Sequence, residues 1–296
     1  MTARYQDFPA TQQDGQTVPR TLIFSDDVSH VYKMQDLQTN NVVAIKEVDC
    51  SLDESLFDSC IQEGFLQGRL RHSGIVPCIN IFRRVSQDHS SQHICLVLPL
   101  CDFVRMDQAP LGTITMEQCD QAFQRLLEVL EYLCNERVMH CNLKPASIFI
   151  CSGHLFLGDF SRARDVSGQA QCLLPPSVPV DYFSAPEMAQ HVPCTLQSDL
   201  FSAGLVLICL YGRLTPAALR HLLGDCPPHS MPETDLHGRV RQILASVNRT
   251  PGLLPLAQVE SAILGLLSRD PCRRPTADSL LQRLFPQPPN PSCSKV

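Results

Sequence analysis

The chain lacks a strong excess of charge of either sign and lacks a long hydrophobic run. Its 24 Lys and Arg residues stand against 30 Asp and Glu residues, so the formal net charge is -6. Proteins that bind nucleic acid or anionic membranes usually carry a basic excess, and we expect neither partner. The longest apolar run, residues 203–212, is roughly half a membrane span. We therefore expect no membrane span, and a buried helix at this run.

Paired cysteine motifs are also missing. The 15 cysteines are scattered singly, without a CxxC pair and without His and Cys at zinc spacing. We expect reduced thiols in a reducing compartment and not a disulfide framework. Residues 1–20 lack the continuous apolar core of a signal sequence. The expected localisation is cytoplasmic, with the nucleus as the alternative, and the sequon at Asn248 is expected to stay unglycosylated.

Hydrophobic periodicity divides the remaining chain into a small strand-rich part and a larger helical part. Residues 42–48 and 94–100 have the composition of strands, and residues 54–70 carry apolar residues at helical spacing. From Thr115 onward helical patterns dominate. A helix over residues 116–136 would have one apolar face, formed by Phe123, Leu126, Leu127, Leu130 and Leu133. The predicted organisation is a disordered lead-in at 1–20, an N-terminal lobe at 21–100, a C-terminal lobe at 101–285 and a Pro-rich tail at 286–296.

Seven short motifs follow one another along the chain. They are VAIK at 43–46, Glu63 nine residues before His72, HCNLKPAS at 140–147, Asp159-Phe160-Ser161, Ala185-Pro186-Glu187, SDLFSAG at 198–204 and RDPCRRPT at 269–276. In this order and at this spacing they resemble the protein kinase family, over residues 21–285. The resemblance implies a bilobal α+β fold with a small strand-rich N-lobe and a larger helical C-lobe. It also implies that Glu187 pairs with Arg274.

The same resemblance implies ATP and Mg²⁺ as ligands. The nucleotide would lie against Val31, Ala44, Lys46, Glu63 and Leu98. Lys46 would hold its phosphates and Glu63 would pair with Lys46, although a Lys–Glu pair between a strand and a helix can equally serve only to tie the small lobe together. The sequence leaves both interpretations open.

The stretch that should cover the phosphates, residues 24–29 (FSDDVS), contains no glycine. Without glycine the backbone cannot easily fold close over phosphates. Asp26 and Asp27 would also repel a polyanion, by ~4 kcal/mol for two unit charges ~4 Å apart at an effective dielectric constant of 20. The alternative is that both carboxylates point to solvent in a surface turn. In either case the cover lacks its glycines.

The catalytic positions themselves have changed. Asn142 stands where the resemblance implies an aspartate base, and a neutral amide does not accept a proton at physiological pH. A general base contributes ~10²–10⁴-fold. The resemblance implies that Lys144 neutralises a phosphate, but this lysine cannot replace the base, so phosphotransfer should be very slow. Asp159 suits magnesium, but Ser147 replaces an asparagine ligand. Ser161 replaces a glycine, which restricts the backbone at this position. We expect weak binding of one metal ion at most.

Features that would regulate or align such an enzyme have changed as well. Cys141 replaces the arginine that pairs with a phosphorylated activation segment, and Val180 replaces a threonine that helps to seat hydroxyl substrates. Gln67 lies in a column of side chains that is usually apolar. Ser167 and Ser177 can still be phosphorylated, but without that arginine we do not expect the familiar on-switch.

The catalytic positions have changed, whereas the residues that hold the fold together are retained. This combination predicts a catalytically impaired kinase-like protein, a pseudokinase. Its predicted role is that of a scaffold or allosteric regulator, with an active protein kinase or another signalling protein as partner. The alternative is a divergent, slow Ser/Thr kinase or nucleotide-binding switch that uses Lys46, Glu63 and Asp159.

The tail carries a weaker signal. Pro286, Pro288, Pro289 and Pro291 form two overlapping PxxP spacings, which can dock on a proline-recognising domain as polyproline II. No arginine lies close to them, which favours the alternative of a plain disordered terminus.

Overall fold

The computed structural model describes residues 20–25, 29–35, 41–51, 53–85, 91–100, 104–169, 171–175, 178–247 and 253–286. The chain divides into two compact units. Unit 1 comprises Met1–Phe103 and Gly158–Ala163, and unit 2 comprises Val104–Leu157 and Arg164–Val296. Several sequence-based predictions lie outside the described residues: the lead-in up to residue 19, Asp26, Asp27, Ser177, Asn248 and the tail from residue 287.

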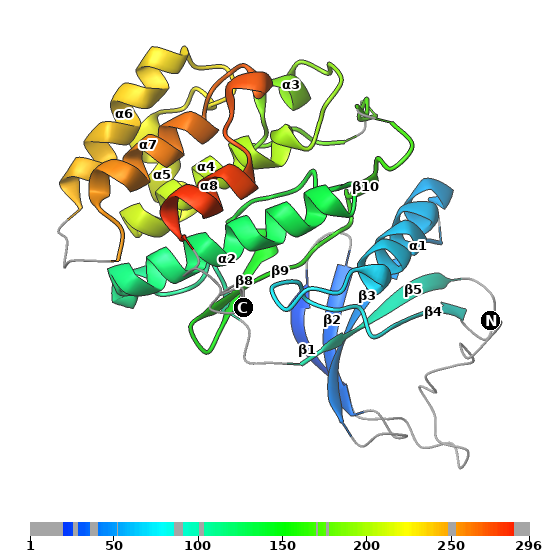
Figure 1. Ribbon diagram of the computed structural model, residues 1–296. Coiled ribbons are helices and arrows are strands. Elements are labelled where there is room, and N and C mark those ends of the chain that lie inside the picture. Colours follow the sequence, from blue (N-terminus) through cyan, green and yellow to red (C-terminus); the bar gives the residue numbers. More distant parts are fainter. Residues whose placement is uncertain are drawn as a thin grey trace, which may run out of the picture. The chain divides into compact units, whose positions relative to one another are not determined.

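Unit 1 is built on a five-stranded antiparallel sheet (Figure 1). Its strands are β1 (Arg20–Ser25), β2 (Ser29–Gln35), β3 (Val42–Asp49), β4 (Asn80–Val85) and β5 (Gln92–Pro99), in the order β1-β2-β3-β5-β4. The two strands expected from their β-branched and aliphatic residues, β3 and β5, lie next to each other inside the sheet. Both predictions are confirmed. Successive side chains point to opposite faces, so these inner strands supply apolar residues to both.

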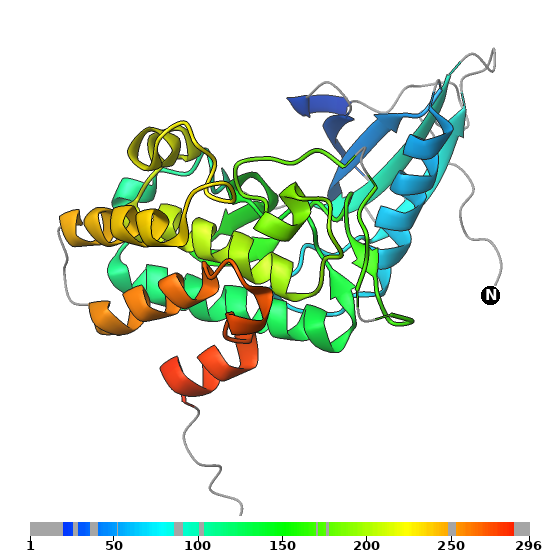
Figure 2. The same ribbon diagram turned by 90° about the horizontal axis from the view of Figure 1, so that it is seen from above.

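One face of this sheet is covered by helix α1 (Glu54–Arg69), as Figure 2 shows from above. Val48, Ile94 and Leu96 are buried on that face together with Cys60 of the helix. Val43, Ile45, Phe82, Cys95 and Val97 form a second buried cluster. The helix predicted over residues 54–70 is confirmed, and its packing fixes which sheet face it occupies.

Two glycines of α1 offer a matched test of this packing. A Cβ added at Gly64 would lie 2.2 Å from Cδ1 and 3.1 Å from Cβ of Ile81 in β4, whereas a Cβ at Gly68 would meet nothing within 4 Å. We expect Gly64→Ala to lower the free energy of unfolding by ~1–2 kcal/mol, because overpacking costs ~1–3 kcal/mol and outweighs the gain in helix propensity. Gly68→Ala should raise it by ~0.5–1 kcal/mol. Urea unfolding of both variants measures the difference, and shifts in the same direction would contradict this packing.

Unit 2 is mainly helical. Its longer helices are α2 (Met116–Asn135), α4 (Gln197–Gly212), α5 (Pro216–Leu223), α6 (Glu233–Ser246), α7 (Leu256–Leu266) and α8 (Ala277–Leu284). Helix α2 begins with a capping box, in which Thr115 and Gln118 each accept a hydrogen bond from the other's backbone N–H. All five apolar residues predicted for its inner face are buried. In Figure 1, α2, α4, α7 and α8 lie together in the body of this unit.

Helix α4 is the central helix of unit 2. Every residue from Ser198 to Tyr211 is buried, which confirms the buried helix expected at the long apolar run. Within the described ranges no single helix has the length and hydrophobicity needed to cross a membrane, and only α4 and α5 taken together reach them, as a pair bent by 101°.

Short elements connect these helices. They are β6 (Val104–Arg105), the 3-10 turns at Leu111–Thr113, Pro145–Ser147 and Pro271–Arg273, β7 (Val138–Met139), β8 (Ile148–Cys151), β9 (His154–Leu157), β10 (Arg164–Asp165) and α3 (Pro186–Ala189). β6, β8 and β9 form one small sheet, and β7 pairs with β10. The loop at 140–147 leaves β7 and ends in the turn before β8. It is therefore held by short strands at both ends.

A buried ion pair holds the segment around α3. The Arg274 guanidinium donates to both carboxylate oxygens of Glu187, at 2.6 and 2.8 Å, and also to the carbonyls of Ser268 and Gln197 at 2.8 Å. The Arg274 side chain is fully buried and lies over the ring of Phe201. The predicted pairing of Glu187 with Arg274 is confirmed. The prediction of a small strand-rich part followed by a larger helical part is confirmed as well.

Candidate functional site

The structure places the predicted site residues in two groups, one in each unit. Val31, Ala44, Lys46, Glu63, Leu98 and Asp159 belong to unit 1, and Asn142, Lys144 and Ser147 belong to unit 2. Each group is described by itself.

Strand register brings four predicted residues of unit 1 to one sheet face. Val31 is the partner of Lys46 across β2 and β3, and Ala44 is the partner of Leu98 across β3 and β5. Directly opposite residues share a face, and so do residues two apart on a strand. The amine of Lys46 therefore lies beside a small apolar wall. An apolar surface of this kind is what a flat ring such as adenine packs against. Nucleotide binding by these residues stays a prediction.

An ionic cluster is centred on Lys46. Its Nζ lies 2.9 and 3.0 Å from the two carboxylate oxygens of Glu63 and 3.7 Å from Oδ1 of Asp159. Burial opposes the charge of Lys46, but the two carboxylates outweigh it and raise the pKa of the amine above its ordinary value. Burial also raises the pKa of Glu63, against the opposing effect of Lys46. A lysine paired with a glutamate is what the resemblance implies for the residues that hold nucleotide phosphates. That role of Lys46 stays a prediction.

Asp159 has an unusual local geometry. Its φ is +59°, a left-handed conformation that aspartate tolerates better than most residues. The hydroxyl of Ser161 donates to Asp159 Oδ1 at 2.8 Å. The oxygen nearest to Lys46 thus also accepts a hydrogen bond from the residue that replaces the expected glycine. The sequence predicted only a stiffer backbone at Ser161 and did not anticipate this contact, although a hydroxyl two residues after an aspartate is a local signal for it.

Gln67 lies one turn after Glu63 on α1 and is buried. Its amide nitrogen donates to the carbonyl of Val76 at 2.6 Å. This contact fixes the helix to the segment that precedes β4, and it satisfies a polar group at a position expected to be apolar.

In unit 2, the loop at 140–147 is anchored by the first turn of α4. The backbone N–H groups of His140 and Cys141 donate to the two carboxylate oxygens of Asp199, at 2.7 and 2.9 Å. Cys141 has a φ of +58°. Asn142 follows it and is buried, with its backbone N–H donating to His140 Nδ1 at 3.3 Å. The backbone hydrogen bonds that hold the loop are therefore in place, and the side chain that the loop presents at position 142 is a neutral amide.

Ser147 has a local role in this loop. Its hydroxyl accepts from the Lys144 N–H at 3.1 Å and donates to the Lys144 carbonyl at 2.8 Å, and the residue is fully buried. The hydroxyl closes the 3-10 turn at Pro145–Ser147 and is directed at this chain's own backbone. A magnesium ligand must instead present its oxygen to the ion.

Lys144 has a partner that the sequence did not predict. Its Nζ lies 3.1 Å from Oδ2 of Asp181, 37 residues further along the chain. Asp181 Oδ1 accepts from the N–H of Phe183 at 2.9 Å and from the hydroxyl of Ser184 at 3.3 Å. An aspartate followed closely by serine and proline is a turn signal, but it does not identify Lys144 as the ion-pair partner. The amine expected to neutralise a phosphate is already paired within the chain.

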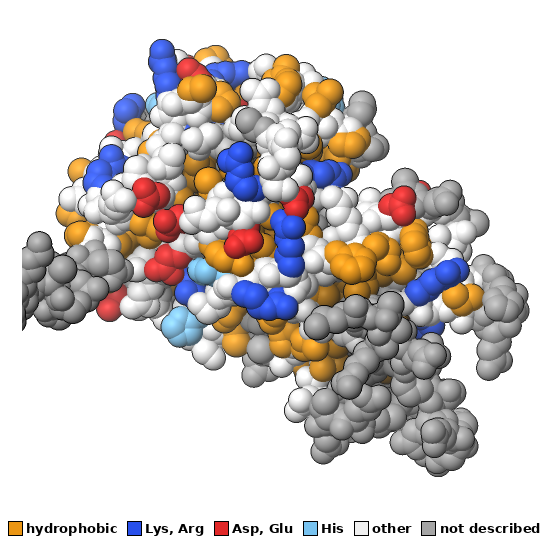
Figure 3. Space-filling view, turned by 45° about the vertical axis from the view of Figure 1, so that its right-hand side comes forward, with side chains coloured by type: hydrophobic (Ala, Val, Ile, Leu, Met, Phe, Trp, Pro, Cys, Tyr) orange, Lys and Arg blue, Asp and Glu red, His pale blue; other side chains and the backbone are white. Residues whose placement is uncertain are grey.

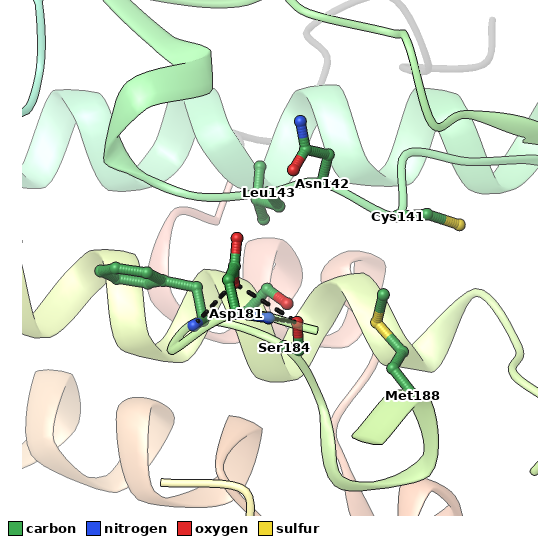
Figure 4. A pocket seen from close by; sticks show the side chains of 8 residues that line it. Cys141, Asn142, Leu143, Asp181, Ser184 and Met188 are labelled. Carbon is green, nitrogen blue, oxygen red and sulfur yellow. Dashed lines mark hydrogen bonds between the residues drawn. The ribbon is translucent and has the colours of Figure 1, made fainter. Parts of the chain in front are cut away.

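Asn142 and Asp181 line the same narrow pocket of unit 2 (Figure 4). The pocket is formed by Cys141, Asn142, Leu143, Asp181, Phe183, Ser184, Met188 and Ser202. Among these side chains Asp181 is the one carboxylate, and it is held by Lys144 and the turn that follows it. The pocket is too narrow to hold a water molecule, and at Asn142 it offers no proton acceptor.

The predicted site residues suit a nucleotide and a magnesium ion to different degrees. No group of three or more His, Cys, Asp or Glu side chains able to hold a metal ion occurs among the described residues. Asp159, with a side chain 32% exposed, is compatible with one cation, whereas Ser147 does not fit a magnesium ligand. The apolar wall and the Lys46 amine of unit 1 are compatible with a nucleotide. The loop of unit 2, in contrast, provides no metal ligand at Ser147.

Comparison with known proteins agrees with the motifs. The family model of the protein kinase domain matches residues 25–285. A probable serine/threonine-protein kinase of Dictyostelium discoideum is 27% identical over 261 residues, covering 85% of this chain and 47% of that protein. The serine/threonine-protein kinase MPS1 of Encephalitozoon cuniculi is 25% identical over 264 residues, covering 87% and 41%. The inactive serine/threonine-protein kinase PLK5 of Mus musculus is 27% identical over 268 residues, covering 87% and 40%.

The chain thus spans less than half the length of these three relatives. What it shares with them is the domain, since the aligned segments cover at least 85% of the chain. The motifs that predicted the resemblance all lie inside the matched range, and the buried Glu187–Arg274 pair supports it structurally. Because the family model matches nearly the whole chain, this protein belongs to the protein kinase domain family.

Proposed function

We propose that this kinase domain acts by binding and not by phosphate transfer, as a scaffold or allosteric regulator of another signalling protein, with an active protein kinase as the favoured partner. One observation carries the proposal: the loop at 140–147 keeps its frame but presents Asn142 at the base position, while Lys144 is paired with Asp181 at 3.1 Å. A loop with a neutral amide at its base position and a paired amine at Lys144 retains the shape of a catalytic loop without its chemistry.

Two further features support the proposal. Ser147 directs its hydroxyl at the Lys144 backbone, and Ser161 donates to the Asp159 carboxylate. In the family pattern position 147 is a metal ligand and position 161 is a glycine close to the metal ligand Asp159. At both positions the hydroxyl is engaged within the chain. One relative in the comparison is itself named an inactive kinase, so loss of activity has a precedent among similar domains.

The surface offers apolar contacts for a protein partner. Phe65 on α1 is 68% exposed, and Ile79 near the start of β4 is 57% exposed. In the space-filling view, hydrophobic side chains are exposed in groups among charged ones (Figure 3). Exposed apolar groups rimmed by polar residues are typical of protein–protein contacts. A partner protein that covers such groups would gain affinity without any chemistry at Asn142.

A phosphotransfer and nucleotide-binding experiment tests the proposal. We expect the purified chain with ATP and Mg²⁺ to show no transfer to a broad panel of protein substrates above a Lys46→Ala control. We also expect ATP with Mg²⁺ to raise the unfolding temperature no more than ATP with EDTA, because the metal positions are incomplete. A ligand at about a hundred times its dissociation constant would stabilise the fold by ~2.7 kcal/mol, which such a measurement resolves.

The binding role is tested in the same preparation. The chain is mixed with a panel of active protein kinases, and their turnover is followed with and without it. Changed turnover of a partner, undiminished by Asn142→Ala, supports regulation by binding. Transfer by the chain alone that survives Asn142→Ala and disappears in Lys46→Ala contradicts the proposal.

The ionic cluster of unit 1 favours a second candidate, a slow kinase or a nucleotide-binding switch. Lys46, Glu63 and Asp159 retain a compact arrangement, with Nζ–O distances of 2.9, 3.0 and 3.7 Å. A switch would show a magnesium-independent rise in unfolding temperature with ATP that Lys46→Ala removes. A slow kinase would show, in addition, transfer that the same variant abolishes.

A further inference from the structure

Two cysteines of unit 2 lie directly opposite each other in an isolated antiparallel bridge. The N–H of Cys172 donates to the carbonyl of Cys194 at 2.9 Å, and the N–H of Cys194 donates to the carbonyl of Cys172 at 2.9 Å. Cys172 belongs to the activation segment, residues 159–187, and Cys194 follows α3. The bridge therefore joins the middle of this segment to the chain just beyond its end.

Such a pair has the geometry that a disulfide needs. Residues that exchange both hydrogen bonds across an antiparallel pair have Cα atoms ~5.5 Å apart, and their side chains lie on the same face. Disulfides form at Cα separations of ~4.4–6.8 Å. Each thiol now contacts a backbone carbonyl, Cys172 that of Leu173 at 3.8 Å and Cys194 that of Val192 at 3.4 Å. Rotation about the Cα–Cβ bonds can bring the sulfurs together without moving the strands.

A third thiol lies near this pair. Burial raises the pKa of the Cys141 thiol in the catalytic loop, and the nearby thiols of Cys194 and Cys172 add to this rise. Figure 4 shows the Cys141 side chain at the edge of the pocket that holds Asn142 and Asp181. Thiols from the catalytic loop, the activation segment and the chain after α3 thus share one region. Cys141 is buried, whereas Cys172 is partly exposed, so an oxidant reaches Cys172 first.

We propose that Cys172 and Cys194 are an oxidation site: a hydroperoxide converts this pair to a reversible disulfide that fixes the activation segment to the chain beyond α3. The segment between the two cysteines contains Asp181, the partner of Lys144, and Glu187, the partner of Arg274. A link across its two ends would hold these contacts in place. Disulfides in reducing compartments are usually of this transient, sensing kind.

The chemistry is balanced in two steps. The Cys172 sulfur attacks one oxygen of the hydroperoxide, the O–O bond breaks, and the products are a sulfenic acid at Cys172 and an alcohol, or water when the oxidant is hydrogen peroxide. The Cys194 sulfur then attacks the sulfenic sulfur, the S–O bond breaks, and the Cys194 proton leaves with the hydroxide as water. Two sulfurs have each lost one electron to the peroxide. An external dithiol reverses the result by thiol–disulfide exchange.

The two thiols differ in a way that suits these roles. Cys172 is partly exposed and is the one an oxidant meets first, whereas Cys194 is fully buried. Burial raises the pKa of Cys194 to about 11. Its thiol therefore stays protonated at neutral pH and resists direct oxidation. Its role in resolving the sulfenic acid rests on its position directly opposite Cys172, and its proton leaves in the step that forms water.

Peptide mapping of the unmodified chain tests the proposal directly. Reduced protein is treated with graded hydrogen peroxide, free thiols are alkylated, and the chain is cut with trypsin and with a protease specific for glutamate. Cleavage after Arg164, Glu187 and Arg213 places Cys172 in peptide 165–187 and Cys194 in peptide 188–213. We expect these two peptides to be recovered joined, with fragment ions assigning the link to Cys194 and not to Cys209. The joined species should disappear completely after treatment with dithiothreitol.

Variants distinguish this pair from the other thiols. Cys172→Ser and Cys194→Ser should each abolish the joined species, while Cys226→Ser, at an exposed cysteine, and Cys141→Ser should leave it unchanged. In the parent chain the disulfide should also slow chymotryptic cleavage at Tyr182 and Phe183, and dithiothreitol should restore the rate. Recovery of Cys172 joined to Cys141, or only as an unlinked sulfinic acid at all peroxide doses, overturns the proposal. Because mapping uses the parent protein, this result does not depend on whether a serine variant folds.

Discussion

Replacement of Arg274 by methionine will lower the free energy of unfolding by ~3–5 kcal/mol. The guanidinium is fully buried and makes two hydrogen bonds to Glu187, at 2.6 and 2.8 Å. Removing one partner of a buried pair leaves an uncompensated charge, and the cost is ~3–5 kcal/mol. The carbonyls of Ser268 and Gln197 lose a donor as well. Chemical denaturation followed by far-ultraviolet circular dichroism measures the change.

A neighbouring arginine provides the matched control. Arg273 is 79% exposed and lies 3.6 Å from the Asp270 carboxylate at the surface. Surface ion pairs contribute ~0–1 kcal/mol, so Arg273→Met should leave the midpoint almost unchanged. A loss in Arg274→Met no larger than that in Arg273→Met would contradict the structural role assigned to the buried pair.

The same pair predicts a pH signature. Burial acts to raise the pKa of Glu187, but the Arg274 hydrogen bonds and charge outweigh burial and hold the pKa below its ordinary value. A carboxyl group with a lowered pKa in the folded state adds stability above its unfolded pKa of ~4.3, and that stability is lost as the pH falls through the folded value. In Arg274→Met the hydrogen bonds and charge of Arg274 no longer oppose burial, and the pKa of Glu187 rises. The difference in unfolding free energy between parent and variant should therefore be largest near neutral pH and should shrink in acid.

Local pattern in the sequence was enough to predict the longest helices and strands. Helices α1, α2 and α4 follow from helical spacing or from a continuous apolar run, and β3 and β5 follow from their β-branched and aliphatic residues. The common face of Val31, Ala44, Lys46 and Leu98 did not follow in that way. It depends on strand register, which pairing between distant strands decides.

The resemblance predicted the positions of the site and the Lys46–Glu63 pair, but not the other contacts of the site. The sequence identified Asn142, Ser147 and Ser161 as changed residues, and it treated the serines as poor replacements. The structure adds that both hydroxyls are engaged, Ser147 with the Lys144 backbone and Ser161 with Asp159. The Lys144–Asp181 pair spans 37 residues, and no local signal connects residues that far apart.

Restoring three positions together should raise phosphotransfer by ~10²–10⁴-fold over the parent chain. The changes are Asn142→Asp, Ser147→Asn and Ser161→Gly. The first supplies a proton acceptor, whose contribution is ~10²–10⁴-fold. The second replaces a hydroxyl committed to the Lys144 backbone by a side chain long enough to reach a metal ion, and the third removes the hydroxyl that donates to Asp159. Transfer of labelled phosphate from ATP with Mg²⁺ to a basic protein substrate measures the gain.

The single changes separate base loss from metal loss. Asn142→Asp alone should gain less than about tenfold, because catalysis of this kind requires bound metal as well as a base. Lys46→Ala added to the triple variant should abolish the gain, since Lys46 holds the ionic cluster of unit 1. An unfolding curve like that of the parent must accompany each variant, because Ser147 is fully buried and asparagine is larger. If the parent already transfers phosphate as fast as the triple variant, these three positions do not limit catalysis, and the proposal of a binding function fails.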